Sequence, residues 1–303
     1  MKPRAPSAER RDGSVPPSRE SGASPWQDAL RRLRRNRLAV TGLLILLGFI
    51  LAAVLAPWIA PFPFDRTNLP YGARPPTHAH LLGTDELGRD LLTRILYGAR
   101  ISFAVGFLAT LVSLTIGVTY GSVAGSKGGR VDHVMMRMVD ILYGLPFMFF
   151  VIILVVIFGR SILNLFVALG AVQWLTMARI VRGQVLSLKA REFVLSAQAI
   201  GASPARLLVR HVLPNALGPI VVYTTLTVPA VMLEEAFLSF LGLGVQPPMS
   251  SWGSLASEGA AAMETYPWLI LFPGMALTAS LLSLNFLGDG LRDALDPQIT
   301  SRH

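Results

Sequence analysis

Two adjacent carboxylates, Glu234 and Glu235, interrupt an otherwise mostly apolar stretch that covers residues 212–245. An ionisable group in the middle of a bilayer costs on the order of 2–3 kcal/mol on insertion scales, so acidic side chains at that depth usually mark a route for ions or substrates. We hypothesise that one of the two faces such a route and meets a substrate amine or a gating partner. The alternative is that both lie at the outer interface, where the cost falls, because they follow Leu217 by most of the length of a membrane-spanning helix.

A second candidate site is the stretch of residues 191–215, in which the positions of glycine, serine and proline predict two short helices and a hinge. The first helix should end before Gly201, a residue suited to the left-handed position after a helix. Ser203 can cap the second helix, Pro204 suits its first position, and Pro214 predicts the next break. Four small residues would let another protein surface approach the backbone closely, namely Ala197, Ala199, Gly201 and Ala202. The alternative is an ordinary amphipathic connecting helix.

The remaining reactive side chains are not arranged for catalysis or metal binding. The chain has no cysteine, which excludes thiolate chemistry and cysteine-ligated metals. Asp85, Glu86 and Asp90 are the best candidate cation ligands, but neighbouring arginines would compete with any cation. No G-x-x-x-x-G-K-[S/T] phosphate loop is present, so the chain has no ATP site of that kind. We expect a non-catalytic chain without a bound metal or cofactor.

The elements that must position these residues are membrane-spanning helices. Apolar residues make up 52% of the 303 and charged residues only 15%, which is well below a usual soluble protein. Six uncharged, mostly apolar runs are each at least 18 residues long, enough to cross a hydrocarbon core. They are residues 38–60, 101–124, 141–159, 161–178, 212–233 and 265–288. The predicted fold class is an all-α integral membrane protein with six transmembrane helices.

Basic residues set the predicted orientation. With alternating spans and a cytoplasmic N-terminus, 21 of the 27 Lys and Arg residues fall on the cytoplasmic side, as the positive-inside rule requires. Both termini are then cytoplasmic, and the net charge of +9 needs no nucleic-acid partner. Asp140 lies three residues after Arg137, a spacing that predicts a same-face ion pair at the inner interface.

The chain divides into six predicted parts. Residues 1–24 have the composition of a disordered cytoplasmic tail, and residues 25–37 that of an amphipathic helix on the membrane lipid surface. Residues 38–60 form the first transmembrane helix, and residues 61–100 an extracytoplasmic segment that becomes helical from Asp90 on. Residues 101–288 form a core with five spans, and residues 289–303 a cytoplasmic tail. Residues 236–245 are too few to span and are predicted to form a re-entrant or pore-rim segment.

Several segments together resemble one family of transporters. Residues 191–215 resemble the permease signature of ABC importers, Glu-Ala-Ala, three residues, Gly, nine residues, Ile, one residue, Leu-Pro, at Gly201, Leu213 and Pro214. They depart from it where residues 195–197 read Leu-Ser-Ala and where His211 replaces the isoleucine. Further segments resemble the oligopeptide permease C-type subunit, namely residues 82–90 (LGTDELGRD), 146–150, 177–184, 237–244 and 288–297.

This resemblance implies a fold, a task and a set of partners. The fold would be the type I ABC importer permease fold, in the bacterial inner membrane. A homologous B-type permease would form the other half of the pathway, and an extracytoplasmic binding protein would deliver the peptide. Two cytoplasmic ATPase subunits would bind ATP and Mg²⁺ and dock on the permease loops. Here that coupling would rest on Ala197, Gly201, Leu213 and Pro214.

Other functions remain open at this point. Dipeptide and nickel importers share the same architecture. A secondary transporter driven by an ion gradient would need charges in the middle of spans and usually internal repeats, and neither is clear here. A membrane protein with a purely structural or assembly role would not need the two-helix loop at residues 191–215.

Overall fold

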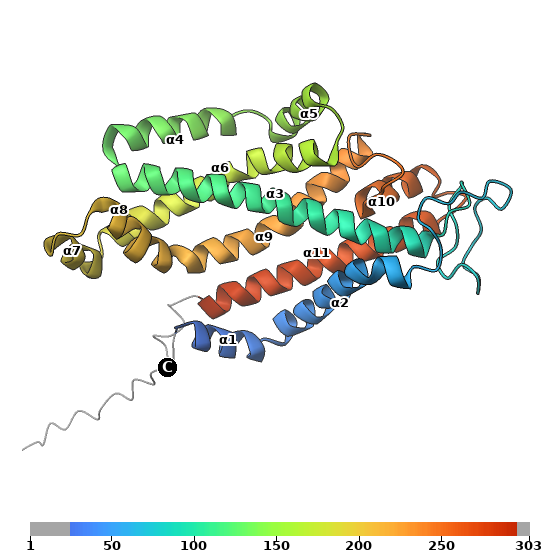
Figure 1. The fold of residues 1–303 in the computed structure, drawn as a ribbon, viewed down its shortest axis with the longest axis horizontal. Helices are drawn as coiled ribbons and strands as arrows, with labels where there is room; N and C mark the ends of the chain where they lie inside the picture. Colours follow the sequence, from blue (N-terminus) through green and yellow to red (C-terminus); the bar gives the residue numbers. More distant parts are fainter. Residues whose placement is uncertain (1–24, 296–303) are drawn as a thin grey trace, which may run out of the picture.

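The computed structural model describes residues 25–295, which form an elongated bundle of helices (Figure 1). The predicted tail 1–24 and residues 296–303 lie outside the described residues. The helices are α1 (Pro25–Arg35), α2 (Arg37–Ile59), α3 (Leu91–Lys127), α4 (Gly129–Tyr143), α5 (Phe147–Phe158), α6 (Ile162–Lys189), α7 (Glu192–Ala199), α8 (Pro204–Leu207), the π-helical turn η1 (Leu208–Val212), α9 (Leu213–Phe240), α10 (Trp252–Ala261) and α11 (Trp268–Leu295). The predicted all-α fold is confirmed for the described part of the chain.

Five helical stretches of the described chain are long and apolar enough to cross a membrane, and there are six if the bent pair α4–α5 counts as one span. The five are α2, α3, α6, the continuous stretch Pro204–Phe240, and α11. The predicted span over residues 141–159 is not one continuous helix, because α4 ends at Tyr143 and the chain bends by 85° between α4 and α5. Gly144 and Pro146 explain the break, since proline has no N–H and pushes the residue before it out of the helical region.

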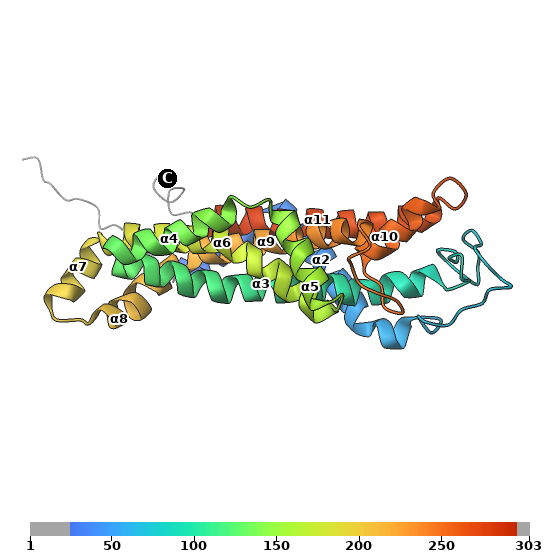
Figure 2. The ribbon, with the colours of Figure 1, turned by 90° about the horizontal axis from the view of Figure 1, so that it is seen from above.

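Successive spans run in opposite directions, so the connections gather at two ends of the bundle. The α7–α8 connection projects at one end, where α1 and the last turns of α11 also lie (Figures 1 and 2). Residues 60–90 and α10 lie at the other end (Figures 1 and 2). This is the alternation that the six predicted spans require. Which end faces the cytoplasm is a matter of charge and stays a prediction.

The most extensive contact between two helices of the described chain is between α3 and α6, and it depends on glycines spaced by four residues. A side chain at Gly117 would lie 2.5 Å from Met177 Cβ, and one at Gly125 would lie 2.8 Å from Val185 Cβ. A side chain at Gly121 would collide with the carbonyl oxygen of Ala178. Residues four apart share one helix face, so α3 presents a groove of small residues to α6, as membrane helices do when their backbones approach.

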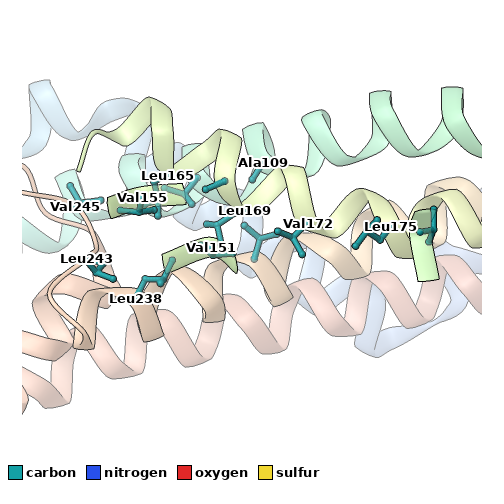
Figure 3. Packing of buried hydrophobic residues seen from close by; sticks show 14 residues of the cluster. Ala109, Val151, Val155, Leu165, Leu169, Val172, Leu175, Leu238, Leu243 and Val245 are labelled. Carbon is teal, nitrogen blue, oxygen red and sulfur yellow. The ribbon is translucent and has the colours of Figure 1, made fainter. Parts of the chain in front are cut away.

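The bent pair is anchored through α5, which packs its apolar side chains against α6 and α9. Val151 and Val155 are almost fully buried there and lie beside Leu165 and Leu169 of α6 (Figure 3). Leu238 of α9 belongs to the same cluster. The bend therefore joins a well-packed half-helix, α5, to the more exposed α4.

Helix boundaries differ from the predicted parts at two places. The helix expected from Asp90 on is confirmed: α3 starts at Leu91, and the Asp90 carboxylate caps it by accepting the Thr93 N–H at 2.8 Å. It continues to Lys127, so the predicted boundary at residue 100 falls inside one helix. At the other end α11 runs to Leu295, and the first residues of the predicted tail 289–303 are helical.

Candidate functional site

Glu234 and Glu235 are neighbours on α9 but point into different surroundings. Glu235 is only 1% exposed, and its Oε1 accepts hydrogen bonds from Ser239 Oγ at 2.8 Å and Ser251 Oγ at 2.6 Å. Ser251 is also the N-cap of α10, and a side chain at Gly253 would lie 2.9 Å from Glu235 Oε2. Glu235 therefore joins α9 to the start of α10 as part of the packing.

Glu234 faces a cavity. Its Oε1 accepts a hydrogen bond from Gln173 Nε2 of α6 at 2.7 Å, while its Oε2 is buried and has no hydrogen-bond partner among residues 25–295. The cavity has a volume of about 340 Å³ and lies between α6, α9 and the α4–α5 bend. It is lined by Leu142, Tyr143, Leu145, Phe150, Ala171, Val172, Gln173, Leu175, Thr176 and Glu234. Of the two predicted pathway residues, Glu234 alone is in a position to meet a guest molecule.

Polar groups from α6 follow one side of this cavity. Gln173, Thr176 and Arg179 are spaced by three residues and share a helix face. The Thr176 Oγ1 and the Tyr143 OH lie 3.1 Å apart, and the Arg179 guanidinium stacks 4.2 Å from the centre of the Tyr143 ring. The bend between α4 and α5 thus carries Tyr143 to the polar face of α6.

Two ion pairs hold α4 against α6 on the α7–α8 side of the cavity. Arg182 donates from Nη2 to Asp132 Oδ2 at 2.6 Å, and Arg179 Nη2 lies 2.7 Å from Asp140 Oδ1. The predicted pairing of Asp140 with Arg137 was wrong, because Arg179 comes from another helix and sequence spacing along α4 cannot reveal it.

The loop at residues 191–215 forms the two-helix projection that its sequence predicts. Gly201 follows α7 with a φ of +88°, and the Ser203 Oγ accepts the Arg206 N–H at 3.4 Å as the cap of α8. Ile200 at the tip is 88% exposed. Exposed small residues flank it at Ala199 and Gly201.

Not every predicted coupling residue lies at this tip. Ala197 is buried and Ala202 is half-buried, so neither presents a free surface. Leu213 and Pro214 lie at the start of α9, where Leu213 is half-buried and Pro214 is exposed. The predicted break at Pro214 was wrong: the π-helical turn η1 joins α8 and α9 into one helical stretch, and its wider hydrogen bonding accommodates the missing N–H.

Sequence reasoning missed the partners that complete the cavity. Gln173 lies inside a run treated as apolar, and an amide in a predicted span is a signal that could have drawn attention to it. Tyr143 and Thr176 carried no such signal, because their juxtaposition depends on the bend between α4 and α5. Ile200 was passed over because an isolated apolar residue in a loop is common.

Comparisons with known families and relatives agree with the helical arrangement. Residues 117–301 match the model of the binding-protein-dependent transport system inner membrane component, and residues 24–76 match the N-terminal TM domain of oligopeptide transport permease C. The oligopeptide transport system permease protein of Escherichia coli strain K12 is 53% identical over 279 residues, covering 91% of this chain and 92% of that protein. The corresponding protein of Haemophilus influenzae is 51% identical, with 91% and 90% covered.

Two further relatives bear on substrate and on fold. A dipeptide transport system permease protein of Bacillus subtilis is 48% identical, with 90% of this chain and 86% of that protein covered. Among solved structures, a chain of the MetNI methionine ABC transporter in inward-facing conformations superposes with a TM-score of 0.56. The two share 17% identity, and the superposition covers 66% of this chain and 94% of the other. The core helices therefore have the fold of an ABC transporter chain.

Proposed function

The chain belongs to the family of binding-protein-dependent transport system inner membrane components, and we propose that it is the permease subunit of an ATP-driven oligopeptide importer. It is a multi-pass protein of the inner membrane. The observation that carries the proposal is the 53% identity to an oligopeptide permease over 91% of the chain. Because the match extends over 279 residues and 92% of the relative, the similarity covers nearly the whole protein and is not limited to one motif.

The structure supports different roles for the two ends of the bundle, one in contact with the ATPase subunits and the other with the peptide-binding protein. The excess of basic residues supports an orientation in which the α7–α8 end would face the cytoplasm. There the exposed tip around Ile200 and Gly201 would contact one of two ATPase subunits, which bind ATP and Mg²⁺. At the other end, residues 60–90 and α10 would face the extracytoplasmic peptide-binding protein.

The cavity beside Glu234 would be this subunit's share of the pathway. It lies beside the bend between α4 and α5, and a B-type permease would supply the opposite wall. The chain itself performs no chemistry. Its task would be to change conformation when the ATPase subunits close. The residues that line the cavity would belong to the helices that move.

A dipeptide importer is the second candidate, because a dipeptide permease is 48% identical to the chain. Peptide length separates the two candidates. The test is ATP-dependent uptake of labelled peptides of two and of five residues into proteoliposomes that contain the complete complex. Uptake of the pentapeptide supports the oligopeptide importer, uptake of the dipeptide alone supports the alternative, and uptake of neither contradicts both.

A further inference from the structure

We propose that the cavity between α6, α9 and the α4–α5 bend is a substrate subsite that binds the N-terminal ammonium of a peptide at the Glu234 carboxylate. The inference rests on the proposed function and adds the part of the substrate that this subunit recognises. It starts from one observation: the Glu234 carboxylate lies at a cavity, and no basic side chain of residues 25–295 forms a salt bridge with it.

The hydrogen bonding of Glu234 is half complete. A carboxylate offers about four acceptor positions, and Glu234 uses one of them for Gln173. Its Oε2 is buried without a partner in the described part of the chain. Burying a carboxylate is costly unless a cation or several donors compensate it. A primary ammonium brings both a positive charge and three donors, so it matches what the site lacks.

The neighbouring Glu235 shows what a structural carboxylate looks like in the same helix. It accepts two serine hydroxyls, is 1% exposed, and is enclosed by the start of α10. Glu234 has no such hydrogen bond on its buried Oε2, and the residue lines the cavity. Glu235 is hydrogen-bonded by two serines within the fold, whereas Glu234 keeps unused acceptor positions beside the cavity.

The nearest basic side chain on the polar face of α6 does not neutralise Glu234. Arg179 lies six residues after Gln173, which is about 9 Å along a helix axis. Its guanidinium pairs with Asp140 and stacks on Tyr143. The negative end of the cavity therefore remains at Glu234.

The rest of the lining suits the start of a peptide chain of any sequence. Thr176 and Tyr143 offer hydroxyl groups to backbone carbonyl or N–H groups, while Leu142, Phe150 and Leu175 are apolar. A volume of about 340 Å³ is at the small end of ligand pockets, so it would take the first residue or two and not a whole oligopeptide. Recognition of the terminus, which every peptide carries, would leave side-chain selectivity low.

The absence of cysteine allows a trapping experiment on the assembled complex. A cysteine introduced by Ala171→Cys lies in the cavity lining, and Ala279→Cys places one in a separate apolar groove on α11 as the matched control. The probe is a pentapeptide with a bromoacetyl group on its second side chain, made with a free or an acetylated N-terminus. The solubilised complex is used without the binding protein, so that the preferences of that protein do not enter. Alkylation at each position is measured by mass spectrometry of this subunit.

We expect the free-amine probe to alkylate position 171 at least about tenfold faster than the acetylated probe, the loss typical of one charged hydrogen bond. Glu234→Gln should remove that difference, and Glu234→Asp should retain part of it. Position 279 should not distinguish the two probes. Equal rates at position 171 for both probes, or no alkylation there above that at position 279, would overturn the inference.

Two measurements keep the result interpretable. The elution volume and apparent Tm of the complex establish whether the Glu234→Gln variant folds. If that variant does not fold, the comparison of the free and acetylated probes in the complex that retains Glu234 still decides the question. Failure of the proposed function is separate, because it would appear as no ATP-dependent peptide uptake by the wild-type complex. Uptake without any amine preference at position 171 would contradict this inference alone.

Discussion

Arg94 of α3 contacts Asp85 and Glu258 with the same nitrogen: Nη1 lies 2.7 Å from Asp85 Oδ2 and 2.8 Å from Glu258 Oε2. Its Nη2 adds a second contact to Glu258 at 3.2 Å. Asp85 also receives Arg89, which donates from Nε at 2.7 Å. These contacts tie the segment before α3 to α10, so the end that would meet the binding protein is held as a unit.

Arg94→Met should weaken this end of the bundle. The Arg94 side chain is 3% exposed, and its removal leaves Asp85 buried with one cationic partner fewer. Breaking a buried ion pair typically costs about 3–5 kcal/mol. The apparent Tm of the purified complex should fall clearly. Arg66→Met, at an exposed arginine of the same segment, is the control and should leave the Tm within about 1 °C of wild type. An unchanged Tm for Arg94→Met would show that the contacts of Arg94 with Asp85 and Glu258 do not stabilise the complex.

Gly121→Leu should separate α3 from α6. Any side chain at position 121 meets the backbone of α6 at Ala178, and backbone cannot move aside cheaply. Overpacking of this kind costs about 1–3 kcal/mol and more where the obstacle is rigid. We expect less folded complex in the membrane and a lower apparent Tm. Gly48→Leu on α2, where a Cβ would meet nothing within 4 Å, is the matched control and should be tolerated.

Glu235→Ala should destabilise the protein. The substitution leaves the Ser239 and Ser251 hydroxyls without their acceptor, and a buried unsatisfied donor costs about 1–3 kcal/mol. The expected result is a lower apparent Tm of the complex. The exposed Glu264, also near α10, gives the comparison: Glu264→Ala should have no measurable effect. If both substitutions behave alike, Glu235 does not join α9 to α10 as described.

Gly201→Asp should uncouple peptide transport from ATP hydrolysis. A charged side chain would block the close approach to the backbone that the small residues allow. The backbone is a second reason: φ is +88° at Gly201, so a side chain there strains the backbone by about 1–3 kcal/mol. The charge would also lie beside Ile200 at the exposed tip. We expect fewer peptides imported per ATP hydrolysed in proteoliposomes. Gly201→Asn, which tolerates a positive φ without adding charge, should retain more coupling. A wild-type ratio of transport to hydrolysis in Gly201→Asp would remove the tip from the coupling role.

The sequence predicted what depends on local chemistry. Hydropathy located the spans, and Ser203, Pro204 and Gly201 predicted the α7–α8 projection, because caps and glycine turns are local features. The break in the third span was missed even though Gly144 and Pro146 signal it, because an uncharged run outweighed them. The close contact of α3 with α6 could also have been predicted from the spacing of Gly117, Gly121 and Gly125.

The rest could not be read from one sequence because it depends on which helices meet. Nothing near Glu234 distinguishes it from Glu235. The difference arises because α9 turns one toward Gln173 of α6 and the other toward Ser251 of α10. The pairing of Asp140 with Arg179 has the same origin, since the two residues belong to different helices.

The central claim is that this chain is the permease half of an ATP-driven peptide importer. The most direct measurement is peptide uptake into proteoliposomes containing this chain, its B-type partner and the ATPases, with the binding protein added outside. We predict uptake that requires ATP and stops when this chain is left out. Uptake by this chain alone without ATP, or no uptake by the complete complex, would contradict the account.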